Sequence, residues 1–140
     1  MKTLWIGLAA LAALALAGCT TPGPKERMQA RLALYEEVAG EPVDSFWYPR
    51  IDRWEPLAED RLAVWINLRQ GFLMKVEKPC SDLEWSHAIQ VTSSVGRVHS
   101  RFDRVIAGQN RCRIIEIRPV ERDAFREAER RAAGATGPVI

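Results

Sequence analysis

The sequence predicts an α+β fold that is mainly β: a small antiparallel sheet or open barrel of about six strands, with an N-terminal and a C-terminal helix. Three observations predict it. A period-two apolar pattern runs over residues 62–68 and resumes over 72–76. Six or so short extended segments follow one another at spacings of about ten residues. Apolar residues recur at helical spacing at both ends of the domain.

The first helix is predicted over residues 25–39. Pro24 stands at a first-turn position, and Gly40 stands where a C-terminal cap belongs. Between them, apolar residues follow at helical spacing: Met28, Leu32, Tyr35 and Ala39.

The middle of the chain is predicted to consist of strands separated by turn signals. The 62–68 and 72–76 segments form a hairpin through residues 69–71. A loop at 78–82 then leads into a short turn or helical piece at 83–86. Further extended segments are predicted at 46–48, 50–57, 88–92, 97–106 and 111–117. Pro119 is expected to begin the second helix, over 120–133, and residues 134–140 are expected to fray.

Composition excludes several classes of protein. The chain has 140 residues, 47% of them apolar and 27% charged, with a formal net charge of +2. These values exclude collagen-like, low-complexity and polytopic membrane proteins and allow one small domain. So small a net charge gives no global field for nucleic acid, which we do not expect as a partner.

The N-terminus is typical of a targeting segment. Lys2 precedes an uninterrupted apolar run over residues 4–17, which is shorter than the roughly 20 residues of a membrane-spanning helix. Residues 16–19 (LAGC) look like the bacterial lipoprotein box. That resemblance implies cleavage after Gly18 and lipidation, including palmitate, of Cys19. The alternative is an ordinary secretory signal that leaves Cys19 as a free thiol.

This segment sets the predicted localisation and domain boundaries. Stable anchoring needs two or more acyl chains, which the lipoprotein resemblance supplies. Thr20 follows the cysteine where an aspartate would signal retention at the inner membrane, so we expect the periplasmic face of the outer membrane. The predicted parts are a signal peptide (1–18), the lipidated cysteine with a short linker (19–24), one β-rich domain (25–133) and the tail (134–140).

The two other cysteines, Cys80 and Cys112, form an even pair in an oxidising compartment, where a disulfide is the expected state. Free or redox-active thiols are the alternative, although the usual Cys-x-x-Cys spacing is missing.

Several segments together carry a family resemblance: SFWYPRIDRWEPL, LAVWINL, GFLMKV followed by PCSDL, a TSSxG turn at 92–96, FDRV, and CRI followed by IRP. With the lipoprotein box, they resemble a family of short proteobacterial lipoproteins of unknown function. The resemblance covers about residues 41–125, and its most specific feature is the cysteine pair. It implies the domain boundaries and the lipid anchor, and no activity.

An aromatic and arginine-rich segment is the most suggestive candidate binding surface. It contains Trp47, Tyr48, Arg50, Arg53 and Trp54. Indole faces beside guanidinium groups can bind sugars or anions, and peptidoglycan or lipopolysaccharide would be the local ligands. The alternative is that these aromatic side chains fill a thin core.

Enzymatic signatures are weak. His87 or His99 with Asp103 and a serine could form a hydrolase site, but no Gly-x-Ser-x-Gly elbow supports it. The two histidines show no metal-ligand spacing, so we expect no metal and no other cofactor. In the second helix, Arg122, Arg126 and Arg130 could touch anionic headgroups or form weak ion pairs with interleaved acids.

The sequence therefore predicts a non-enzymatic, lipid-anchored envelope protein that serves as an accessory or interaction module. Its expected partners are the membrane, through the anchor, and an envelope protein or peptidoglycan. The alternatives are an envelope glycan-binding module and a small hydrolase.

Overall fold

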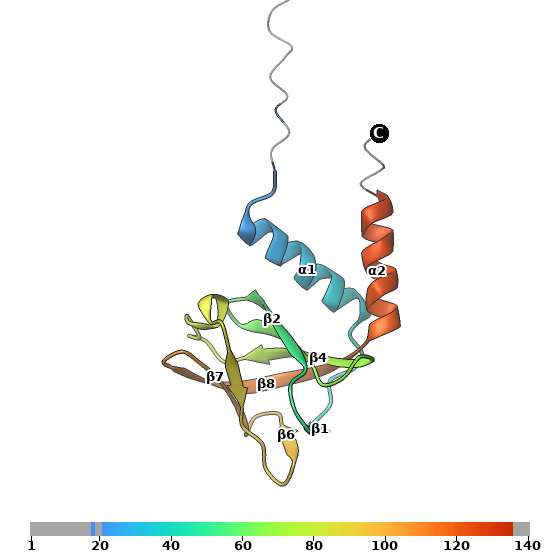
Figure 1. Ribbon diagram of the computed structural model, residues 1–140. Helices are drawn as coiled ribbons and strands as arrows, with labels where there is room; N and C mark the ends of the chain where they lie inside the picture. The colour runs from blue at the N-terminus through green and yellow to red at the C-terminus, as the bar shows by residue number, and fades with distance from the viewer. Residues whose placement is uncertain (1–17, 19–20, 136–140) are drawn as a thin grey trace, which may run out of the picture.

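A computed structural model describes residue 18 and residues 21–135. It confirms the predicted fold class, with six antiparallel strands forming a curled sheet, or half-barrel (Figure 1). The order across the sheet is β2 (Arg53–Ala58), β3 (Arg61–Trp65), β4 (Gln70–Val76), β8 (Asn110–Glu121), β7 (Arg104–Ala107) and β5 (Ile89–Val91).

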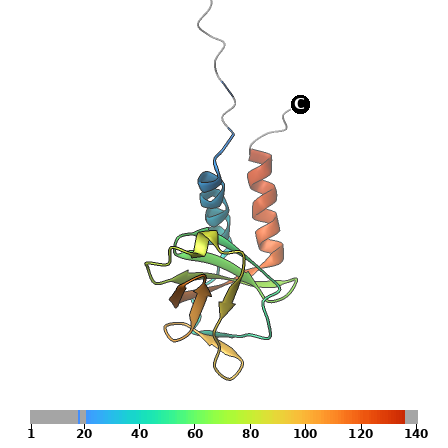
Figure 2. The same cartoon turned by 60° about the vertical axis from the view of Figure 1, so that its left-hand side comes forward.

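Two short strands form a separate ribbon. β1 (Ser45–Trp47) pairs antiparallel with β6 (Arg97–His99). The ribbon lies at the end of the molecule away from the two helices (Figures 1 and 2). The piece predicted near residue 83 is the 3-10 helix η1 (Leu83–Trp85).

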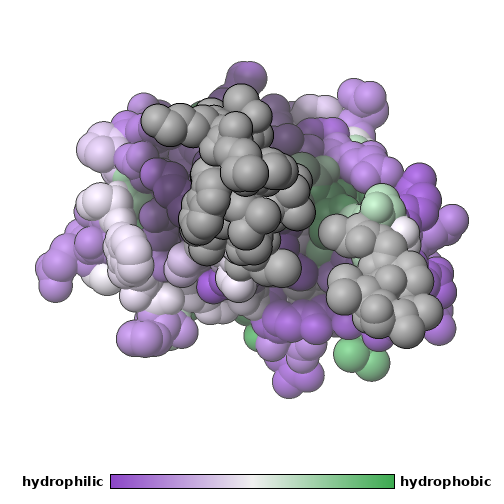
Figure 3. Space-filling view, turned by 90° about the horizontal axis from the view of Figure 1, so that it is seen from above, coloured by the Kyte–Doolittle hydropathy of each residue, from purple (hydrophilic) through white to green (hydrophobic). Residues whose placement is uncertain are grey.

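Both helices, α1 (Pro24–Val38) and α2 (Arg122–Ala135), stand on the same side of the sheet (Figure 2). The surface of this end of the molecule is mostly hydrophilic where it is visible (Figure 3). Among the described residues, no helix is both long enough and apolar enough to cross a membrane.

The sheet separates two apolar cores, and β3 contributes to both. Leu62 and Val64 point into the half-barrel, where a large cluster includes the disulfide. Ala63 and Trp65 point the other way and pack with Tyr35 of α1 and other residues beneath the helices. Successive strand residues face opposite sides, so a strand buried on both faces is apolar throughout.

The second helix begins later than predicted. Pro119 is part of β8, where it pairs with Phe72, and α2 starts at Arg122. The Pro119 carbonyl accepts a hydrogen bond from the Gly40 N–H at 2.9 Å. The main-chain polar groups of Pro119 thus face away from β4, so its missing N–H costs this pairing no bond.

The segment predicted as one strand over residues 97–106 is two strands, β6 and β7, in different sheets. Asp103 produces the turn between them. Asp103 is 2% exposed, and its carboxylate accepts hydrogen bonds from the His99 N–H and the Thr92 hydroxyl, both at 2.7 Å. Arg101 takes a left-handed conformation in this turn, with φ +70°.

Candidate functional site

A pocket of about 280 Å³ opens between the outer face of the sheet and the helices. Strands β2 and β3 and the first turn of α2 supply most of it, and α1 closes one side. The lining residues are Arg31, Tyr35, Arg53, Trp54, Glu55, Trp65, Arg122, Phe125 and Glu129.

A chain of polar contacts crosses the pocket from β3 to α1 and back to β2. The Trp65 indole N–H donates to the Tyr35 hydroxyl at 3.1 Å, and that hydroxyl donates to Glu55 Oε1. Arg31 donates to both oxygens of Glu55, with Nε–Oε2 at 2.6 Å and Nη2–Oε1 at 2.8 Å. Arg31 Nη1 also lies 3.2 Å from Glu129 Oε1 on α2.

These contacts fix protonation states in the pocket. Burial is the largest cause that raises the pKa of Tyr35, and the hydrogen bond to Glu55 raises it further, so the hydroxyl remains a donor at neutral pH. The hydrogen bond to Glu55 also raises the pKa of Arg31, which stays charged. Arg31 therefore serves as the counterion of two glutamates.

Two other arginines share one aromatic neighbour. The guanidinium carbons of Arg53 and Arg122 lie 5.4 and 5.3 Å from the centre of the Trp65 ring. This ring lies across Gly71, where a Cβ atom would come within 2.6 Å of it. Among the ion pairs of residues 21–135, none involves Arg53 or Arg122.

The residues of the predicted aromatic-arginine surface do not all meet in one place. Arg53 and Trp54 line the pocket, and Trp54 also packs against the core inside the half-barrel. Trp47, on the β1–β6 ribbon, is 59% exposed and lies over Gly96. Tyr48 is half-buried against the core, and Arg50 is exposed; neither lines the pocket.

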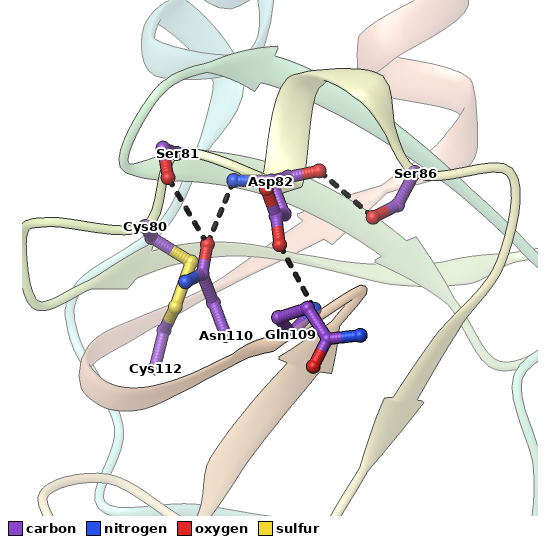
Figure 4. Close-up of a disulfide and its surroundings, with 7 residues drawn as sticks. All are labelled: Cys80, Ser81, Asp82, Ser86, Gln109, Asn110 and Cys112. Atoms are coloured by element: carbon purple, nitrogen blue, oxygen red, sulfur yellow. Dashed lines mark hydrogen bonds between the residues drawn. A yellow bond between two sulfur atoms is a disulfide. The ribbon is translucent and has the colours of Figure 1, made fainter.

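Cys80 and Cys112 form a disulfide that joins the loop after β4 to β8 (Figure 4). Asn110 supports this junction, since its Oδ1 accepts the Asp82 N–H at 2.7 Å. Asp82 Oδ2 in turn accepts the Gln109 N–H at 2.8 Å. Cys19 lies outside the described residues.

Of the candidate catalytic residues, His99 and Asp103 lie together and His87 lies elsewhere. His87 is exposed beside η1, whereas His99 Nδ1 lies 3.4 Å from Asp103 Oδ2 at the β6–β7 turn. Across residues 21–135, no serine hydroxyl hydrogen-bonds to either imidazole. No group of three or more potential metal ligands occurs in the same part of the chain.

Sequence reasoning did not identify most of the pocket. Tyr35 lies on the apolar face of the first helix as predicted, but the contacts of its hydroxyl were not predicted. The acids of the second helix were predicted to pair within that helix, whereas one of them, Glu129, pairs with Arg31 of α1. The continuous apolar stretch at 62–66 was the available signal, since it indicates a strand covered on both faces.

The fold and pocket define a small, disulfide-containing, mainly β protein with two helices covering one end of its sheet. A family model described as a family of unknown function, DUF6491, matches residues 1–136, and the chain belongs to that family. Comparisons with curated proteins and with solved structures give no match.

Proposed function

We propose that this protein is a non-enzymatic lipoprotein of the bacterial envelope, anchored through Cys19 and facing the periplasm from the outer membrane. The observation that carries this proposal is the Cys80–Cys112 disulfide, whose cysteines are 0% and 3% exposed. Disulfides persist in oxidising compartments, and the apolar segment ending at Cys19 is a route to one.

The anchor would also orient the domain. The chain from Cys19 to Pro24, where α1 begins, spans at most about 18 Å when extended. The N-terminal end of α1 would therefore lie close to the bilayer surface. The β1–β6 ribbon, at the opposite end of the molecule (Figure 1), would face the periplasm.

Metabolic labelling with palmitate, followed by membrane fractionation, tests the anchor. The wild-type protein should incorporate label and sediment with the outer membrane, whereas Cys19→Ser should lose the label and become soluble. Cys112→Ser is the matched control, because it removes a cysteine and should keep the label. Continued sedimentation of unlabelled Cys19→Ser with the membranes would contradict the proposal.

A glycan-binding module is the second candidate, and the exposure of Trp47 favours it. An indole that is 59% exposed offers a stacking face for sugars, and the ribbon that carries it would project away from the membrane. Peptidoglycan fragments should then quench tryptophan fluorescence in the wild type and in Trp85→Ala, but not in Trp47→Ala. Trp85 is a suitable control because it is 79% exposed on η1. Absence of quenching in the wild type would exclude this candidate.

A further inference from the structure

The charges that line the pocket do not cancel. Three arginines and two glutamates line it, a balance of one positive charge. Arg31 contacts both Glu55 and Glu129, so these two acids are already engaged by one cation. The side that holds Arg31 and the two glutamates therefore carries one negative charge, and the side that holds Arg53 and Arg122 carries two positive charges.

Strand pairing places Arg53 beside Trp65, and the start of α2 places Arg122 near the same ring. Arg53 is the direct partner of Trp65 across β2 and β3. Arg122 follows β8, and its N–H donates to the Arg69 carbonyl at 2.9 Å, which fixes the start of α2 beside β4. Both guanidinium groups then contact the same indole ring.

This arrangement leaves the N–H donors of the two guanidinium groups without a protein acceptor among the described residues, and Arg53 is exposed. A guanidinium group has five N–H donors in a planar fork that fits an oxyanion. In the part of the chain that the structure describes, the side chains of Arg53 and Arg122 donate to no carboxylate. Contact with the face of an indole uses the charge but not these donors.

The size and charge of the pocket restrict the ligand. Its volume of about 280 Å³ lies just below the usual range for small-molecule sites, so only a small ligand fits. A ligand with one negative charge neutralises the net positive charge of the lining side chains. A dianion would leave an excess negative charge close to Glu55 and Glu129. Trp65, Tyr35 and Phe125 form a floor that is at most 4% exposed, so the arginines provide the main contacts.

We propose that this pocket binds a small organic monocarboxylate, whose carboxylate accepts hydrogen bonds from Arg53 and Arg122 above Trp65. The site does not depend on the membrane anchor. The competing explanation is that the two arginines only shield the indole from water.

A titration of the full chain in nonionic detergent separates the two explanations. Its readout is the NMR signal of the Trp65 indole N–H. Acetate and acetamide are matched probes, because they have nearly the same shape and only acetate is charged. Acetate should shift the signal saturably up to about 50 mM, which saturates a site with a Kd of about 1 mM. Acetamide should cause no shift, and added sodium chloride should weaken the acetate response.

Substitutions locate the site. Arg53→Gln and Arg122→Gln should each weaken acetate binding about tenfold or more, as expected for a lost charged hydrogen bond. Arg104→Gln is the control, because it removes the same charge from an exposed position on β7, and it should bind acetate normally. No saturable shift, an equal response to acetamide, or unchanged binding in both pocket variants would overturn the proposal. Tighter binding of inorganic phosphate than of acetate would overturn the assignment to carboxylates.

Discussion

The indole N–H of Trp65 donates a hydrogen bond to the hydroxyl of Tyr35, with 3.1 Å between the nitrogen and the oxygen. This bond joins β3 to α1, and the same hydroxyl continues the chain by donating to Glu55 of β2. Tyr35 also stacks on Phe125 of α2, with ring centres 4.2 Å apart. One side chain thus connects both helices to the outer face of the sheet.

Replacing Tyr35 with phenylalanine should destabilise the fold. The substitution keeps the ring but leaves the buried Trp65 N–H without its acceptor and removes a donor from Glu55. We expect the free energy of unfolding to fall by about 1–3 kcal/mol, measured by denaturant titration. Tyr48→Phe is the control, because no hydrogen bond of the Tyr48 hydroxyl occurs among residues 21–135, and it should change stability by less than about 0.5 kcal/mol. Equal effects of the two substitutions would contradict the role of this bond.

Tyr35 should also make the free energy of unfolding depend on pH in the alkaline range. An unfolded tyrosine ionises near its ordinary pKa of 10.0, whereas burial and the bond to Glu55 raise the pKa of Tyr35 in the fold. The stability that this residue contributes is therefore complete below pH 10 and is lost as the pH rises toward the higher folded pKa. Unfolding measured from about pH 9 to about pH 11.5 should show a steeper loss in the wild type than in Tyr35→Phe. Parallel curves would show that Tyr35 ionises normally in the fold.

Gly71→Ala should disturb the packing of Trp65. A Cβ atom at this position would lie 2.6 Å from the indole ring, which is itself 1% exposed and has little room to move. We expect a loss of about 1–3 kcal/mol of unfolding free energy, together with a changed tryptophan emission spectrum. Gly134→Ala in α2 meets no atom within 4 Å and should be neutral or slightly stabilising. A neutral Gly71→Ala would mean that the ring does not rest on this glycine.

Removing the disulfide should cost a large part of the stability. Cys80 and Cys112 are 32 residues apart, and closing such a loop stabilises a fold by about 3–4 kcal/mol in the chain-entropy model. The double variant Cys80→Ala/Cys112→Ala should therefore unfold at a much lower denaturant concentration than the wild type. A reducing agent should lower the wild-type midpoint and leave that of the double variant unchanged. A double variant as stable as the oxidised wild type would show that the bridge is dispensable.

The elements that the sequence predicted well are those with strong local signals. The hairpin follows from the period-two pattern of residues 62–68 and 72–76, but its connection was predicted too late: β3 ends at Trp65 and β4 begins at Gln70. The first helix is displaced by one residue at each end. The predicted start of the second helix was wrong because Pro119 locally resembles a helix start, whereas its pairing with Phe72 of β4 and the hydrogen bond from Gly40 to its carbonyl are both long-range contacts. The β6–β7 turn was missed because it depends on where the carboxylate of Asp103 binds.

In the pocket, too, the residues with a local sequence signal were predicted and those placed by long-range contacts were not. Arg53 was a candidate because it lies in an aromatic and arginine-rich segment. Arg122 reaches the same indole only because β8 pairs with β4, and a long-range pairing of this kind is not encoded in local spacing. Charge pairing between helices, such as Arg31 with Glu129, likewise depends on how α1 and α2 pack.

The redox state of Cys80 and Cys112 in intact cells tests most directly the claim that this domain functions in the envelope. Cells producing the full-length Cys19→Ser chain, or the same chain without residues 2–18, are treated with a thiol-blocking reagent whose added mass is read on a gel. We expect no reactive thiol in the chain that keeps its N-terminal segment and two in the chain that lacks it, because only the first would reach an oxidising compartment. Two reactive thiols in the full-length chain would show that the domain does not reach an oxidising compartment.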